Sequence, residues 1–176
     1  MSADEASSDL AELRRAALED PRNGVLRYLL AAELAHLQDY ESALLEFSAA
    51  IALDPSLDIA RLQLGLLHLT LTQADHALTV LAPLEDLPDD NPLKHFQRGL
   101  TALIHDNVPA FFQSMQHGIE LNTTNQALQR DMQMLLGHVS QATATPGSAS
   151  MSSAGVTSVP VAGDVRTDFS LYGVKH

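Results

Sequence analysis

The sequence predicts an all-α fold: an α-α superhelix of three helix pairs, with a capping helix at each end and a disordered tail. Three observations support this prediction. Apolar residues make up 45% of the chain and aromatic residues 5%, a balance that favours stacked helices over packed sheets. Residues 39–55 place apolar side chains at helical spacing and end in Asp54-Pro55, where proline stops the helix. The same pattern recurs at an interval of about 34 residues.

This interval connects three stretches of the chain, each with two apolar or small residues one helical turn apart. The aligned residues are Ala43, Ala77 and Phe111 at the first position, and Phe47, Leu81 and Met115 at the second. The helix before each stretch repeats as well, with Leu30-Ala31, Leu64-Gly65 and Arg98-Gly99 in register. The recurring unit is therefore a pair of helices, A and B.

The pattern resembles the tetratricopeptide-repeat family, whose helix B carries alanine, then phenylalanine four residues later, then proline eight residues further on. Ala43, Phe47 and Pro55 match it in the first repeat. The resemblance covers Gly24 to Thr123. It assigns the repeats to residues 24–57, 58–91 and 92–125, within a domain of residues 21–139. Where the family has tryptophan, this chain has Arg27, Arg61 and His95.

The first elements have clear start signals. Residues 1–20 are expected to form the N-terminal capping helix, helical over 9–20 after a frayed start. Because Asp20-Pro21 lies one period before Asp54-Pro55, this helix could also be the second helix of a decayed repeat. Asn23 is expected to cap the first helix A, which runs to Leu37. Asp39 is expected to cap the first helix B, because short polar side chains accept hydrogen bonds from the free amides of a helix start.

Capping residues and a proline predict the bounds of the second helix pair. Ser56 is expected to cap a helix A over residues 57–71, which is apolar nearly all round and therefore buried on more than one side. Thr72 to Asp75 has the spacing of a capping box that opens helix B. Pro83 should kink or shorten that helix near Thr79, because its ring clashes with the carbonyl four residues earlier.

The third pair and the closing helix complete the domain. Asn91 is expected to cap the third helix A, with Pro92 at its first position, where no amide hydrogen bond is lost. Asp106 or Asn107 is expected to cap the third helix B. A closing helix is then expected over residues 124–139, since helical arrays need a solvated final helix.

The composition changes after the closing helix. Residues 140–176 are rich in serine, alanine and glycine, with little charge and no periodicity, and are expected to be a flexible tail. The last ten residues, Thr167 to His176, regain apolar character. Two interpretations stay open, a short docking motif and an unselected end. The apolar residues are Phe169, Leu171, Tyr172 and Val174.

Charge and composition exclude several classes of partner. The formal net charge is −12, which argues against nucleic acid or an anionic membrane as the main partner. The chain has no cysteine, so disulfide and thiol chemistry are excluded. It shows no secretory signal and no apolar run of about 20 residues. We therefore expect a cytoplasmic protein.

No constellation of residues predicts catalysis or a cofactor. The eight histidines include no pair at the spacing of one helical turn, which a helical metal site would need. The serines cluster in the tail, and no phosphate-binding glycine motif is present. We therefore expect no catalytic residues, no metal and no cofactor, and a protein that is not an enzyme.

The family resemblance implies that one face of each helix A lines a concave groove. On this sequence that groove consists of Val25, Tyr28, Ala32, Ala35, Ile59, Leu62, Leu66, Leu69, Leu93, Phe96, Leu100 and Leu103. All of them are apolar, so the groove lacks the basic residues that would clamp carboxylates. Large apolar patches are rarely left exposed. A partner segment, a second copy or the chain's own tail could cover the groove, or the face could close on itself as core.

These features predict a protein–protein interaction module, an adaptor or chaperone that holds an apolar segment of a partner in its groove. The plan of capping helix, three repeats and closing helix is similar to that of class II chaperones of type III secretion. This similarity implies a role in a bacterial secretion or assembly system. The alternatives are a self-associating scaffold, such as a homodimer, and a non-catalytic regulatory subunit of an enzyme complex.

Overall fold

Residues 3–144 are described by a computed structural model, with side chains described from residue 10 onward. Over this range the chain forms eight α-helices and one short 3₁₀ helix, and no strand. The described residues divide into two compact units, residues 3–67 and residues 68–144. No helix among them is both long and apolar enough to cross a bilayer.

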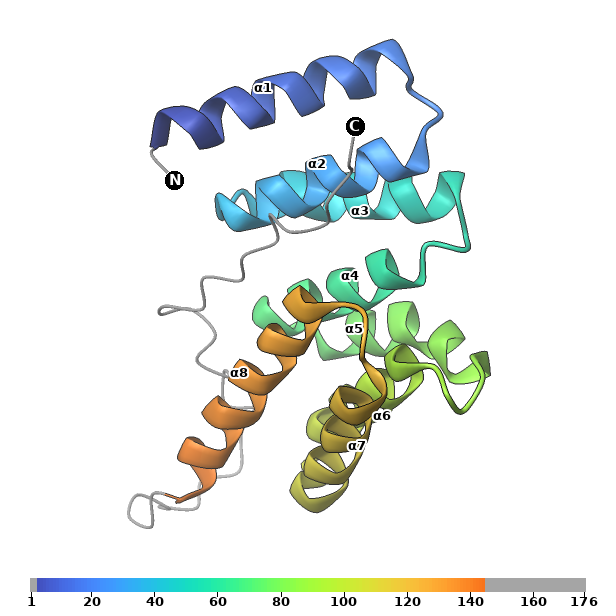
Figure 1. The fold of residues 1–176 in the computed structure, drawn as a ribbon, viewed down its shortest axis with the longest axis vertical. Coiled ribbons are helices and arrows are strands. Elements are labelled where there is room, and N and C mark those ends of the chain that lie inside the picture. Colours follow the sequence, from blue (N-terminus) through green and yellow to red (C-terminus); the bar gives the residue numbers. More distant parts are fainter. Residues whose placement is uncertain (1–2, 145–176) are drawn as a thin grey trace. The chain divides into compact units, whose positions relative to one another are not determined.

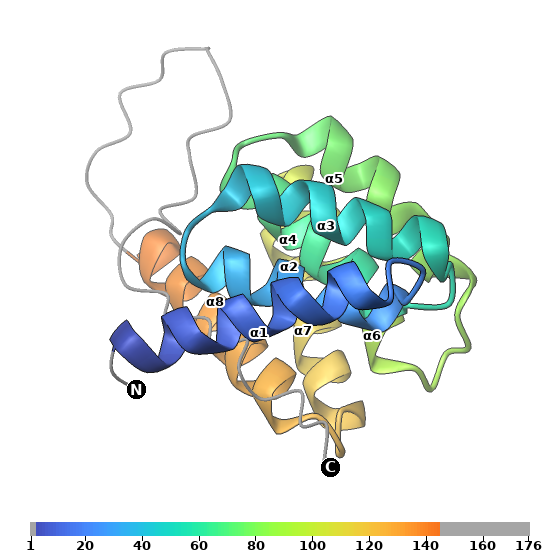
Figure 2. The ribbon, with the colours of Figure 1, turned by 90° about the horizontal axis from the view of Figure 1, so that it is seen from above.

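The first unit contains α1 (Ala3–Glu19), α2 (Gly24–His36), α3 (Tyr40–Leu53) and most of α4 (Asp58–Thr70). α2 and α3 pack as an antiparallel pair, and α1 lies alongside α2 (Figure 1, Figure 2). Ala43, Phe47 and Ala50 on α3 are fully buried, as their helical spacing predicts. The ring of Tyr28 meets Phe47 across this pair, with centroids 6.1 Å apart.

The second unit contains the end of α4, then α5 (Ala74–Leu81), the 3₁₀ helix η1 (Ala82–Asp86), α6 (Pro92–Ile104), α7 (Val108–Leu121) and α8 (Gln126–Ala144). α6 packs on α7 and α7 on α8, while η1 contacts both α5 and α6. Gly99 on α6 and Gly118 on α7 let the α6–α7 pair approach closely. A Cβ at Gly99 would lie 2.7 Å from the sulfur of Met115.

The turn between helices A and B has the same geometry in all three repeats. The residues with left-handed backbone conformation are Gln38, Thr72 and Asp106, with φ of 62°, 58° and 55°. After each, the next amide donates to the carbonyl five residues earlier, the hydrogen bond that defines a Schellman motif. These bonds are Asp39 N to Leu34 O at 2.9 Å, Gln73 N to His68 O at 2.8 Å, and Asn107 N to Ala102 O at 2.8 Å. The turn therefore recurs at an interval of 34 residues, from residue 38 to 72 and from 72 to 106.

Several predicted caps are confirmed. The Asn23 side chain accepts hydrogen bonds from the amides of Val25 and Leu26, and Asp39 accepts one from Ser42. Asn91 caps α6 by accepting from Leu93, with Pro92 in the first turn. Asn107, rather than Asp106, caps α7. The shortening at Pro83 is also confirmed, because α5 ends at Leu81 and the chain continues as a 3₁₀ helix.

Two other predicted caps are wrong. α4 begins at Asp58, two residues after Ser56, and the Ser56 hydroxyl donates to the Asp54 carboxylate at 2.6 Å. The predicted capping box at Thr72 does not form, because Thr72 is itself the left-handed residue of the turn. Gln73 then precedes α5 without a side-chain capping hydrogen bond.

The ends of the domain also differ from prediction. α1 begins at Ala3, so most of the residues expected to be frayed are helical. α8 begins at Gln126, after Asn125, whose side chain accepts a hydrogen bond from the Leu128 amide at 3.0 Å. It continues to Ala144, so residues 140–144 belong to this helix and not to the tail. Residues 145–176, with the predicted docking motif, lie outside the described residues.

Candidate interaction surface

The second position of each repeat carries an accessible apolar side chain. Val25, Ile59 and Leu93 lie in the first turns of α2, α4 and α6. Val25 is 44% exposed, and Ile59 and Leu93 are half-buried. The amides of Val25 and Leu93 donate to the capping asparagines at 3.1 and 2.9 Å, which fixes both residues at the helix starts. Apolar side chains thus remain accessible at equivalent points of all three repeats.

The fifth position is core in all three repeats, which corrects the prediction of a groove open along its whole length. Tyr28, Leu62 and Phe96 are buried. Tyr28 lies against Phe47 of its own pair, and the Phe96 ring lies against Gly118 of its own pair. A glycine on helix B leaves room for a large ring from helix A, and the ring then faces inward.

The remaining predicted residues divide between core and surface. The buried members of the predicted set are Tyr28, Ala32, Ala35, Leu62, Phe96 and Leu100. The accessible members are Val25, Ile59, Leu66, Leu69, Leu93 and Leu103. Half of the predicted residues are therefore core, and the other half are accessible.

Two buried glutamines, Gln63 on α4 and Gln97 on α6, occupy equivalent repeat positions and did not enter the predicted site. Among the described residues, neither Nε2 nor Oε1 of Gln63 has a hydrogen-bond partner. In Gln97, Nε2 donates to the Thr101 hydroxyl at 3.2 Å, and Oε1 has no partner within the same part of the chain. A glutamine that recurs after one period in otherwise apolar helices was the signal available in the sequence.

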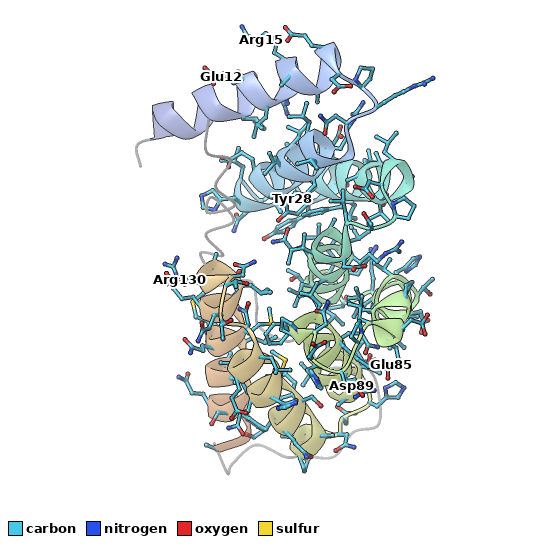
Figure 3. The ribbon with its side chains drawn as sticks, turned by 45° about the vertical axis from the view of Figure 1, so that its right-hand side comes forward. Glu12, Arg15, Tyr28, Glu85, Asp89 and Arg130 are labelled. Atoms are coloured by element: carbon cyan, nitrogen blue, oxygen red, sulfur yellow. The ribbon has the colours of Figure 1, made fainter. Side chains whose placement is uncertain are left out.

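An ionic network lies at the start of α6. The guanidinium of Arg98 donates to the carboxylate of Glu85 through Nε and Nη2, and this hydrogen bonding lowers the pKa of Glu85. Lys94 lies 2.8 Å from Asp89, and its hydrogen bond lowers the pKa of Asp89. The Nε2 of His95 donates to the backbone carbonyl of Asp89 at 2.7 Å. Glu85 and Asp89 lie close together beside α6 (Figure 3).

Two histidine pairs form between helices. The rings of His68 and His76 stack with centroids 5.4 Å apart, and those of His95 and His117 meet edge-on at 4.3 Å. Spacing along a single helix could not predict these pairs, because each joins an A helix to a B helix. Among residues 10–144 no group of three metal-binding side chains converges.

Comparison with known proteins identifies solved structures with a similar fold. No family model matches the chain, and no curated protein matches its sequence. Among solved structures the chain is similar to a MamA RS-1 ArsTM double mutant, with a TM-score of 0.56 and 20% identity over 79% of this chain and 76% of that one. It is also similar to MamA (residues 41 to the end) from Desulfovibrio magneticus RS-1, with a TM-score of 0.54 and 20% identity, covering 78% of this chain and 80% of that one. MamA is a helical, tetratricopeptide-like protein, and the predicted all-α fold of tetratricopeptide-like helix pairs is confirmed.

Proposed function

We propose that this protein is an interaction module that binds an apolar segment of another protein through the accessible side chains of its A helices. The observation that carries the proposal is the accessible apolar residue at the second position of every repeat: Val25, Ile59 and Leu93. Leu66 in the first unit, and Leu69 and Leu103 in the second, are further half-buried leucines of the A helices. Covering such side chains stabilises a complex by about 25 cal/mol for each Å² of apolar area removed from water.

The chemistry of the surface favours binding over catalysis. The accessible A-helix residues are aliphatic, and Arg98 on α6 is paired with Glu85. An aliphatic surface selects partners by shape and apolar area, which suits an adaptor or a chaperone. A non-catalytic regulatory subunit would use the surface in the same way, with an enzyme as the partner.

Photo-cross-linking from the full-length protein tests this function. A benzoylphenylalanine is placed at Val25, Ile59 or Leu93, and at the exposed Gln113 on α7 as a control. We expect polypeptides to be cross-linked from the A-helix positions of each unit and not from Gln113, with mass spectrometry locating an apolar segment in each captured polypeptide. Equal capture from Gln113 would contradict the proposal.

A second function, self-association as a scaffold, is favoured by a different observation. Leu45 on α3 is 72% exposed and Leu18 on α1 is 79% exposed. Leu45 lies opposite the buried stripe of α3, so it does not belong to the A-helix surface. If copies pair through the exposed Leu45 on α3, a dimer should form at micromolar concentration in sedimentation velocity and be lost in Leu45→Glu. A monomer in the unsubstituted protein would exclude this function.

A further inference from the structure

Two histidines of neighbouring helices lie together at the turn between α4 and α5. The ring of His68, in the last turn of α4, and that of His76, in the first turn of α5, have centroids 5.4 Å apart and planes inclined by 21°. Both residues belong to the second unit. His68 is half-buried and His76 is exposed, so the pair is accessible from solvent. Neither residue is part of the apolar A-helix surface described above.

Gln73 fixes the ring of His68 in one tautomer. The Nδ1 of His68 lies 2.7 Å from Oε1 of Gln73. An amide oxygen only accepts hydrogen bonds, so Nδ1 carries the hydrogen and donates, and Nε2 of the neutral ring keeps its lone pair. The backbone amide of Gln73 also donates to the His68 carbonyl at 2.8 Å. A histidine held through one nitrogen in this way presents the other nitrogen to a metal ion.

The separation of the two rings suits two imidazoles on one metal ion. A bond from a metal to a histidine nitrogen is about 2.0–2.1 Å long, which places the ring centroid about 3.2 Å from the ion. At a tetrahedral angle two such centroids are about 5.2 Å apart, close to the observed 5.4 Å. Because His76 is exposed, its ring has room to turn a nitrogen lone pair toward the same ion as His68 Nε2.

We propose that His68 and His76 bind a divalent transition-metal ion of the class that imidazole prefers, with Cu²⁺ bound more tightly than Zn²⁺. Among residues 10–144 no third metal-binding side chain converges with the pair, so water completes the coordination. The open positions can accept a donor atom from another molecule. The site goes beyond the proposed function, because it joins helix A of the second repeat to its helix B through an ion.

The charges around the pair favour a bound cation. Between residues 62 and 129 the only lysine and arginine are Lys94 and Arg98. Both are already paired, with Asp89 and Glu85 respectively, so neither places an uncompensated positive charge near the turn. The formal net charge of −12 further raises the local concentration of cations at the protein surface.

The second pair of histidines, His95 with His117, lacks these properties and provides an internal comparison. The Nε2 of His95 donates to the Asp89 carbonyl at 2.7 Å, so this nitrogen carries a hydrogen and has no lone pair for a metal. His95 is only 8% exposed, and a hydrated ion does not reach its other nitrogen. Close approach of two rings is therefore not sufficient, and only the pair at the α4–α5 turn meets the requirements.

Copper binding to the full-length protein tests the inference. We expect Cu²⁺ added below one equivalent to broaden the amide signals of residues 66–78 before those of residues 115–120, which surround His117. The electron paramagnetic resonance spectrum of the equimolar complex should show coupling to two imidazole nitrogens. Broadening that begins elsewhere in the chain, or coupling to a single nitrogen, would overturn the inference.

Single substitutions distinguish the pair from isolated histidines, with Kd for Cu²⁺ measured by competition with a chelator. His68→Gln and His76→Gln should each raise this Kd about tenfold or more, because the second imidazole no longer binds from a tethered position. Gln73→Ala, which removes only the partner of His68 Nδ1, should raise it about tenfold. His117→Gln is the matched control and should leave it unchanged. An unchanged Kd in His68→Gln or His76→Gln, or an equal rise in His117→Gln, would overturn the two-histidine site.

Discussion

The ring of Phe96 on α6 lies against Gly118 on α7 so closely that a Cβ at residue 118 would be 2.5 Å from its Cε1 atom. Phe96 is fully buried, so its ring has little room to move aside. The absence of a side chain at residue 118 is therefore what allows a large aromatic residue on helix A to become core in the third pair.

Gly118→Ala should lower the free energy of unfolding by about 1–2 kcal/mol. Overpacking a core costs about 1–3 kcal/mol, and the gain in helix propensity of about 1 kcal/mol offsets part of it. Gly137 on α8 is the control, because a Cβ there would meet nothing within 4 Å. Gly137→Ala should raise stability by about 1 kcal/mol in urea denaturation. Equal effects of the two substitutions would contradict the close packing at Gly118.

The left-handed turn residues give a second prediction. Thr72→Gly should raise stability by about 1 kcal/mol, because a β-branched residue is strained at a φ of 58° and glycine is not. Asp106→Gly should gain less, since aspartate tolerates this conformation better. Gln116→Gly, at an exposed site inside α7, is the control and should lower stability by about 0.5–1 kcal/mol. Thermal denaturation followed by circular dichroism measures all three, and destabilisation by Thr72→Gly would rule out the turn geometry.

A third prediction concerns the ion pair between α2 and α3. The Nη1 of Arg27 donates to both carboxylate oxygens of Glu46, at 3.1 and 2.8 Å. The two side chains are only 25% and 21% exposed. Glu46→Gln should therefore cost about 1–2 kcal/mol, because it leaves a partly buried guanidinium without its counter-charge. Glu19→Gln, which removes the exposed pair with Arg15, should change stability by less than about 0.5 kcal/mol. Urea denaturation measures both variants, and the midpoint of Glu46→Gln should fall further than that of Glu19→Gln. Equal midpoints would contradict a structural role for the Arg27–Glu46 pair.

The lowered pKa values of Glu85 and Asp89 predict acid sensitivity. A carboxylate whose pKa is lower in the folded state stabilises the fold above its unfolded pKa, and this stabilisation is lost as the pH falls through the folded pKa. The ordinary values are 4.5 for Glu85 and 3.8 for Asp89, so the loss begins below about pH 4.5. Both groups are exposed, and the effect should be small. Arg98→Gln should flatten the fall in melting temperature between pH 5 and pH 3, whereas an unchanged slope would show that the pair contributes nothing.

Local signals predicted much of this fold, and packing between helices decided the rest. The caps at Asn23, Asp39 and Asn91 depend on amides within three residues, so the sequence alone could indicate them. Ser56 is not the cap because α4 begins two residues after it, at Asp58. The residue at which a helix begins after a loop depends on the conformation of that loop.

The candidate surface was predicted only in part for a similar reason. Periodicity placed Val25 and Leu93 on one face of their helices, and both side chains are accessible. Periodicity could not predict that Phe96 is buried against α7, because this burial depends on the absence of a side chain at Gly118. Likewise, the pairing of His95 with His117 requires knowing which turns of α6 and α7 meet.

The binding affinity of A-helix variants tests the central claim most directly. Three variants remove the accessible apolar side chains of the A helices: Val25→Ser, Ile59→Ser and Leu93→Ser. The control variant, Leu45→Ser, removes an exposed leucine on α3. Isothermal titration against the segment identified by cross-linking should give a Kd raised about tenfold or more for each A-helix variant and an unchanged Kd for Leu45→Ser. An unchanged Kd in all three A-helix variants, with the loss confined to Leu45→Ser, would contradict the claim that the protein binds through its A helices.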